Sequence, residues 1–164
     1  ELADKLVSAD NPLTARVWVN RIWHRLMGRG IVTTPSDWGT RGANPTHPEL
    51  LDALADRFMR RHWSTKDMIR HIVLSKTYRQ SCIGDSNADR LDPANLTYHR
   101  FNRKRHTCET LVDSLLALSE DWDESTRGVA VNLEESPEAK RRMIFHLLSR
   151  VQPSPAAKAF DLPS

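Results

Sequence analysis

The fold is decided by the stretch at residues 11–39, NPLTARVWVNRIWHRLMGRGIVTTPSDWG. Pro12 suits the first turn of a helix, and Gly28-Arg29-Gly30 supplies the glycines that often follow a helix end. The spacing predicts a helix over Pro12–Met27. Apolar residues on two opposite sides are typical of a helix that is buried on both. One side carries Ala15, Trp18, Val19, Ile22, Trp23, Leu26 and Met27, and the other carries Leu13 and Val17.

A helical hairpin is predicted over Thr46–Tyr78. Its first helix opens with Thr46 followed by Glu49, and its second opens with Ser64 followed by Asp67. Each pair has the pattern of a capping box, in which two side chains satisfy backbone N–H groups at the helix start. The connection between the helices is short, so we expect them to be antiparallel neighbours.

The remaining sequence predicts an opening helix end within Glu1–Ser8, a helix over Thr107–Ser119 and a short strand near Ile144. Turn-forming residues at 81–96 and repeated prolines at 149–164 indicate less ordered segments. The predicted fold class is mainly α, an irregular multi-helix domain with a buried central helix, a helical hairpin and at most one or two short strands. We expect residues 1–164 to be a single domain and a fragment of a longer multidomain protein.

The composition excludes several classes of protein. A net charge of +3 is only mildly basic and argues against nucleic acid as a partner. No apolar run approaches the ~20 residues that a membrane-spanning helix needs. Cys82 and Cys108 lack the spacing of zinc ligands, and the chain has no CxxCH motif, so we expect no cofactor and no covalent haem. The two cysteines fit a disulfide in an exported chain and equally fit two free thiols.

The first candidate site is Asn20, Arg21 and His24 on the predicted central helix. Asn20 and His24 are one turn apart, and the planar guanidinium of Arg21 suits a carboxylate or a sulfate. This arrangement indicates binding of an anion or a glycan. In the alternative interpretation, Arg21 pairs with a buried carboxylate, Asp37 or Asp52, and pins the following loop.

The second candidate site lies on the loop after the central helix. Asp37 and Trp38 sit between glycines, and loops of this kind often carry binding residues. Trp38 suits stacking on a sugar face, and it also suits a hydrophobic plug over the core. His47 is a third candidate, since His47, Glu49 and His24 together could ligate a metal. The predicted capping box already explains Glu49, so we expect no metal here.

The last candidate is a basic cluster around Phe101. Nucleic acid, an anionic polysaccharide and an acidic partner domain are the ligands considered for it. Its anion-binding candidates are Arg100, Arg103, Lys104 and Arg105. No combination of nucleophile, base and orienting group follows from spacing anywhere in the chain, so no catalytic residue is assigned.

Several motifs follow one another in a fixed order and resemble one family. That family is the C-terminal region, domain of unknown function 1553, of large planctomycete proteins that often also carry a cytochrome c-like domain. The resemblance extends from about Asn11 to Asp161. Its motifs are Asn11-Pro12-Leu13-Thr14-Ala15-Arg16, Val19-Asn20-Arg21-x-Trp23, Gly28-Arg29-Gly30-Ile31-Val32, Thr34-Pro35-Ser36-Asp37, Thr46-His47-Pro48-Glu49-Leu50-Leu51-Asp52, Ser75-Lys76-Thr77-Tyr78-Arg79-Gln80-Ser81 and Arg100-Phe101-Asn102-Arg103.

The resemblance implies an exported protein of the periplasm or cell envelope, with any haem held by the separate cytochrome-like domain. An exported location also favours an acidic glycan or partner domain over nucleic acid at the basic cluster. We therefore expect a non-catalytic scaffold or interaction domain whose partners are neighbouring domains of the same polypeptide. One alternative is a polysaccharide-active enzyme, or its substrate-binding half, with the polar candidates lining one open pocket. Another is a module that binds anions or acidic glycans.

Overall fold

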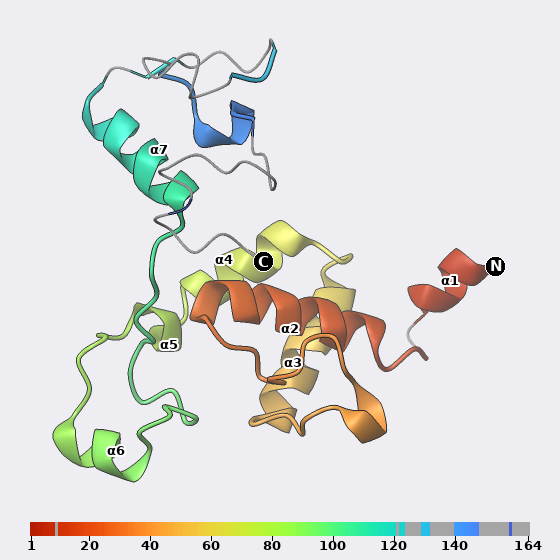
Figure 1. Ribbon diagram of the computed structural model, residues 1–164. Helices are drawn as coiled ribbons and strands as arrows, with labels where there is room; N and C mark the ends of the chain where they lie inside the picture. Colours follow the sequence, from red (N-terminus) through yellow and green to blue (C-terminus); the bar gives the residue numbers. More distant parts are fainter. Residues whose placement is uncertain (9, 121, 124–128, 132–139, 148–157, 159–164) are drawn as a thin grey trace. The chain divides into compact units, whose positions relative to one another are not determined.

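The computed structural model describes residues 1–8, 10–120, 122–123, 129–131, 140–147 and 158. The chain forms two compact units, residues 1–104 and residues 105–164. The described residues are mainly helical and contain two isolated β-bridges but no strand, which confirms the predicted fold class (Figure 1). The expectation of a single domain stays a prediction.

The first unit holds most of the helices. Figure 1 shows α3 crossing α2, while α6 stands apart from both. The elements of this unit are α1 (Leu2–Leu6), α2 (Thr14–Met27), the 3-10 turn η1 (Gly39–Arg41), α3 (Pro48–Arg60), α4 (Thr65–Val73), α5 (Lys76–Arg79) and α6 (Ser86–Leu91).

The hydrophobic core of the first unit lies between α2, α3 and α4. Burying each large apolar side chain contributes about 1.5–3 kcal/mol, so this cluster is the main source of the unit's stability. Its helical members are Ala15, Val19, Ile22, Trp23 and Met27 of α2, Leu51, Leu54, Ala55 and Phe58 of α3, and Met68 and Ile72 of α4; Ile31, Val32 and Tyr98 join from outside the helices.

The prediction that the central helix is buried on two sides is wrong. Trp18 is 45% exposed and Leu13 is 48% exposed, and both Arg21 and His24 face solvent. The core covers a single stripe of α2 that contains Val19. Position on the helical wheel placed Trp18 with the core, but its ring lies outside the core and stays 45% exposed beside α4.

The boundaries of α2 follow from local hydrogen bonds. The helix is assigned from Thr14 rather than from Pro12. The side-chain oxygen of Asn11 caps the chain just before it, by accepting from the N–H groups of Leu13 (3.0 Å) and Thr14 (3.4 Å). The helix ends as predicted, at Gly28, whose φ of 84° is easily reached only without a side chain.

The helical hairpin is confirmed as α3 and α4, but only one predicted N-cap is found. Ser64 accepts from the Asp67 N–H at 3.3 Å. The capping box at Thr46 is wrong. The N–H (2.9 Å) and hydroxyl (3.2 Å) of Thr46 both donate to the carbonyl of Ile31. The Thr46 side chain is therefore bonded to the loop after α2 and does not cap α3. The flanking residue of α3 is instead His47, which makes no side-chain cap bond.

The segment after α4 differs from its predicted form in two places. A continuous helix to Tyr78 is wrong, because α4 stops at Val73 and Ser75 starts the separate helix α5 by accepting from the Tyr78 N–H at 3.2 Å. Residues 81–96, expected as a loop, contain α6. The Asp85 carboxylate starts that helix by accepting from two backbone N–H groups, each at 3.1 Å.

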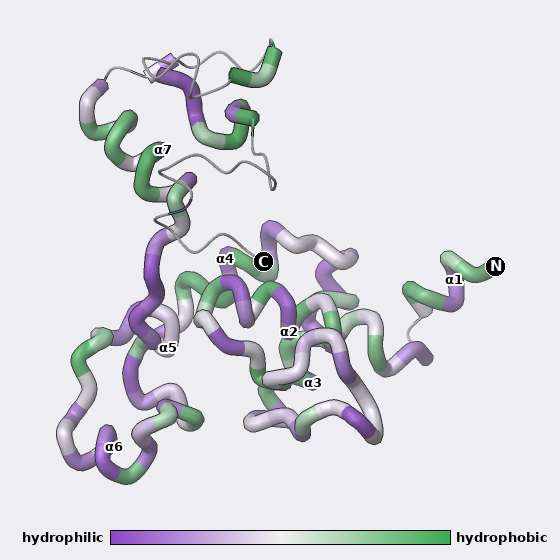
Figure 2. The backbone as a smooth tube through the Cα atoms, viewed as in Figure 1, coloured by the Kyte–Doolittle hydropathy of each residue, from purple (hydrophilic) through white to green (hydrophobic). Residues whose placement is uncertain are grey.

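The second unit is built around α7 (Cys108–Leu118), which confirms the helix predicted there. Figure 2 shows α7 as predominantly hydrophobic. The strand expected near Ile144 is wrong, because Met143–Phe145 forms the 3-10 turn η2. Asp113 of α7 holds this turn by accepting the Met143 N–H at 2.8 Å. The tail at 149–164 lies outside the described residues except for Lys158.

Candidate functional site

Asn20 is a structural clamp at the centre of the first unit. Its side chain is fully buried, its amide nitrogen donates to the Val32 carbonyl (3.0 Å), and its amide oxygen accepts the Val32 N–H (2.9 Å). The amide thus pairs with both backbone groups of Val32, as a neighbouring strand would. Gly30 leaves the space, since a Cβ there would lie 2.4 Å from the Val32 oxygen and 2.9 Å from the Asn20 amide nitrogen.

Arg21 and His24 are exposed on α2. Among the described residues Arg21 pairs with neither Asp37 nor Asp52. Asp52 instead binds Arg16, with 2.6 Å between its carboxylate and the guanidinium Nε. This hydrogen bond lowers the pKa of Asp52 and raises the pKa of Arg16.

Trp38 is partly buried and packs against the core, while Asp37 faces solvent. The Trp38 indole donates to the Pro35 carbonyl at 3.1 Å. Thr34 fixes the loop, because its hydroxyl donates to the Asp37 carbonyl (2.9 Å) and accepts the Ala43 N–H (2.9 Å). Trp38 therefore closes one edge of the core.

His47 belongs to an aromatic cluster with Tyr98 and Trp23. Its Nδ1 lies 3.0 Å from the Thr46 hydroxyl, and its ring is centred 5.6 Å from the ring of Tyr98. The buried Tyr98 hydroxyl accepts the Trp23 indole N–H at 2.9 Å, and these two rings meet edge to face at 5.5 Å. The part of the chain that the structure describes contains no group of three or more His, Cys, Asp or Glu placed to hold a metal.

The side chains of the basic cluster differ in their surroundings. Arg100 binds Asp89 of α6, with 2.7 Å between Nε and the carboxylate. The Lys104 ammonium donates to the carbonyls of Leu26 (2.6 Å) and Arg25 (3.4 Å) at the end of α2. Arg103 is exposed, and Arg105 belongs to the second unit.

Sequence reasoning missed the turn that begins at Asp92. The Asp92 carboxylate accepts the N–H of Leu96 (2.9 Å), the N–H of Thr97 (2.8 Å) and the hydroxyl of Thr97 (2.7 Å). These bonds favour the charged carboxylate and lower the pKa of Asp92 to about 2. An Asp before Pro93 is a known turn signal and could have identified this element.

We expect the Asp92 turn to loosen in acid. The pKa in the folded chain lies below the ordinary value of about 3.9, so the unfolded state takes up the proton first as the pH falls. The stabilisation is therefore complete above about pH 4 and is lost progressively towards pH 2. The measurement is an NMR pH titration of the backbone amides of Leu96 and Thr97.

Both amides should titrate with a midpoint near pH 2, and the variant Asp92→Asn should abolish this transition. A midpoint at the ordinary value, or an unchanged transition in the variant, would contradict the assignment.

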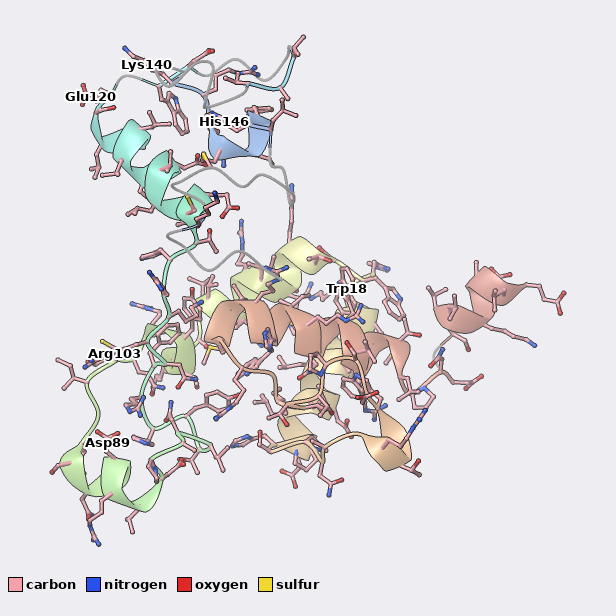
Figure 3. The ribbon with its side chains drawn as sticks, in the orientation of Figure 1. Trp18, Asp89, Arg103, Glu120, Lys140 and His146 are labelled. Atoms are coloured by element: carbon pink, nitrogen blue, oxygen red, sulfur yellow. The ribbon has the colours of Figure 1, made fainter. Side chains whose placement is uncertain are left out.

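An apolar groove lies between α2 and α4, and sequence reasoning missed it because Trp18 was assigned to the core. The groove encloses about 350 Å³. The Trp18 indole donates to the Thr65 hydroxyl at 3.1 Å, which fixes the ring beside α4 (Figure 3). The lining residues are Trp18, Ile22 and Leu26 of α2, Ile69 of α4, and the arginines Arg21 and Arg25.

The family model described as PSD1, protein of unknown function (DUF1553), matches residues 1–164. The chain belongs to this family. Membership confirms the resemblance drawn from the ordered motifs. No curated protein and no protein of solved structure matches the chain.

Each of two further hollows in this family member has among its lining residues at least one side chain that forms an ion pair. One is bordered by Arg57, Arg60 and Arg61, of which Arg57 pairs with Asp67 at 3.1 Å. The other includes the Arg16–Asp52 pair described above.

Within the described ranges, no helix is long and apolar enough to cross a membrane.

Proposed function

We propose that the chain is a non-catalytic interaction domain of an exported planctomycete multidomain protein that also carries a cytochrome c-like domain. The observation that carries the proposal is the open apolar groove on α2. Trp18 is 45% exposed and Ile69 is 38% exposed in one hollow, which is the composition of a surface that buries itself against a partner.

Two of the polar candidates support this proposal because their side chains serve the fold. Asn20 clamps Val32, and His47 packs on Tyr98. A polysaccharide-active site would need the polar candidates to line one opening. Of them, only Arg21 lines any of the three hollows described above.

The test is association between the chain and the remaining domains of the same polypeptide, expressed separately and followed by sedimentation velocity. The wild-type chain should form a complex, and Trp18→Asp should weaken it at least about tenfold, because a buried aromatic anchor commonly dominates an interface. The matched control is Leu91→Asp on α6, an exposed apolar residue outside the groove, which should bind like the wild type.

Absence of a wild-type complex, or equal binding by the Trp18 variant, would overturn the proposal. Polysaccharide turnover by the chain that one side-chain change abolished without unfolding it would do the same.

A further inference from the structure

We propose that the α2–α4 groove receives an acidic amphipathic helix, an inference that rests on the proposed function and specifies its partner. The groove offers two features that such a helix matches, an apolar floor and a pair of cations. Both features come from residues of the first unit alone.

The floor suits hydrocarbon side chains. Ile22 and Leu26 lie one turn apart on α2, and Ile69 faces them from α4. Trp18 adds an aromatic ring that is already held by its 3.1 Å hydrogen bond to Thr65. Because this ring is fixed before binding, ordering it costs little conformational entropy when a partner arrives.

The two arginines give the groove a positive charge. Arg21 and Arg25 are four residues apart on α2, so their side chains are neighbours on one face. Neither has an acidic partner among the described residues, and no carboxylate lines the groove. The nearest acid in sequence to Ile69 is Asp67, which is bound to Arg57.

A helix fits this geometry better than an extended strand or a glycan. Two carboxylates at positions i and i+4 of a partner helix have the same spacing as Arg21 and Arg25, and the apolar face of that helix meets the floor. An extended peptide pairs with a sheet edge, and the described residues form none. A sugar needs several polar partners, whereas the floor presents hydrocarbon.

The experiment is a selection of displayed helical peptides, each of about 16 residues and random at surface positions, on the full chain. The recovered peptides are then synthesised and their affinity is measured by calorimetry. We expect them to carry Asp or Glu three or four residues apart beside an apolar stripe. We expect Arg21→Glu with Arg25→Glu to weaken them at least tenfold, and peptides with Lys in place of these acids to regain binding to that variant.

The matched control is Arg41→Glu with Arg79→Glu, which changes the net charge equally at two exposed arginines outside the groove. It should leave the affinity within about twofold. A sulfated hexasaccharide is measured in parallel, and it should not compete with the peptides.

Recovered peptides without acidic pairs, binding that ignores Arg21 and Arg25, or competition by the hexasaccharide would each overturn this inference. If that happens while the neighbouring domains still bind through Trp18, the proposed function stands and only its partner class is wrong. If the neighbouring domains also fail to bind, both proposals fail.

Discussion

Replacing Asn20 with alanine should lower the free energy of unfolding by about 2–6 kcal/mol, because the N–H and the carbonyl of Val32 both lose their buried partner. Each unsatisfied group costs about 1–3 kcal/mol. The measurement is urea denaturation followed by tryptophan fluorescence, with attention to the transition of the first unit.

The matched control for Asn20 is His24→Ala, one turn along the same helix but exposed. It should change the free energy of unfolding by no more than about 0.5 kcal/mol. An Asn20 variant as stable as the wild type would show that Val32 finds other partners, and the clamp would then be unnecessary.

Replacing Tyr98 with alanine should cost about 3–5 kcal/mol of unfolding free energy, the usual effect of deleting a large buried aromatic ring. Tyr98 is only 6% exposed and joins Trp23, His47 and Arg29, whose guanidinium lies 5.9 Å from the ring centre. Without the Tyr98 ring, Trp23 and His47 lose the residue that both of them contact. The same urea titration measures the effect.

Tyr98→Phe separates the ring from the hydroxyl. It retains the packing but leaves the Trp23 indole N–H without its acceptor, so it should cost about 1–3 kcal/mol. If the phenylalanine variant were as unstable as the alanine variant, the hydrogen bond and not the ring would hold the cluster.

Local sequence signals predicted where the helices lie well, and their first and last residues less well. The period of apolar residues was sufficient for α2, α3, α4 and α7, because burial of one stripe is what creates that period. It could not tell Trp18 from Trp23, since both fall on the apolar arc. Only Trp23 is covered, because the Tyr98 segment, 75 residues later in the chain, packs on it.

The candidate sites were harder to predict because their contacts join distant residues. Thr46 has the right neighbour for a capping box, yet the carbonyl of Ile31, 15 residues earlier, takes its hydroxyl. The sequence marks Arg100 as basic but not its partner Asp89. The groove required knowledge of where α4 lies beside α2, which no motif encodes.

The end of α2 depends on residues that are made much later. Lys104 donates to the carbonyls of Leu26 and Arg25, and the Asn102 amide donates to the carbonyl of Met27 at 3.2 Å. These partners are separated by 75–79 residues. During synthesis these three bonds can therefore form only after the ribosome has released the chain beyond residue 104. A shortened version of the first unit that stopped before Asn102 would leave those three carbonyls to water.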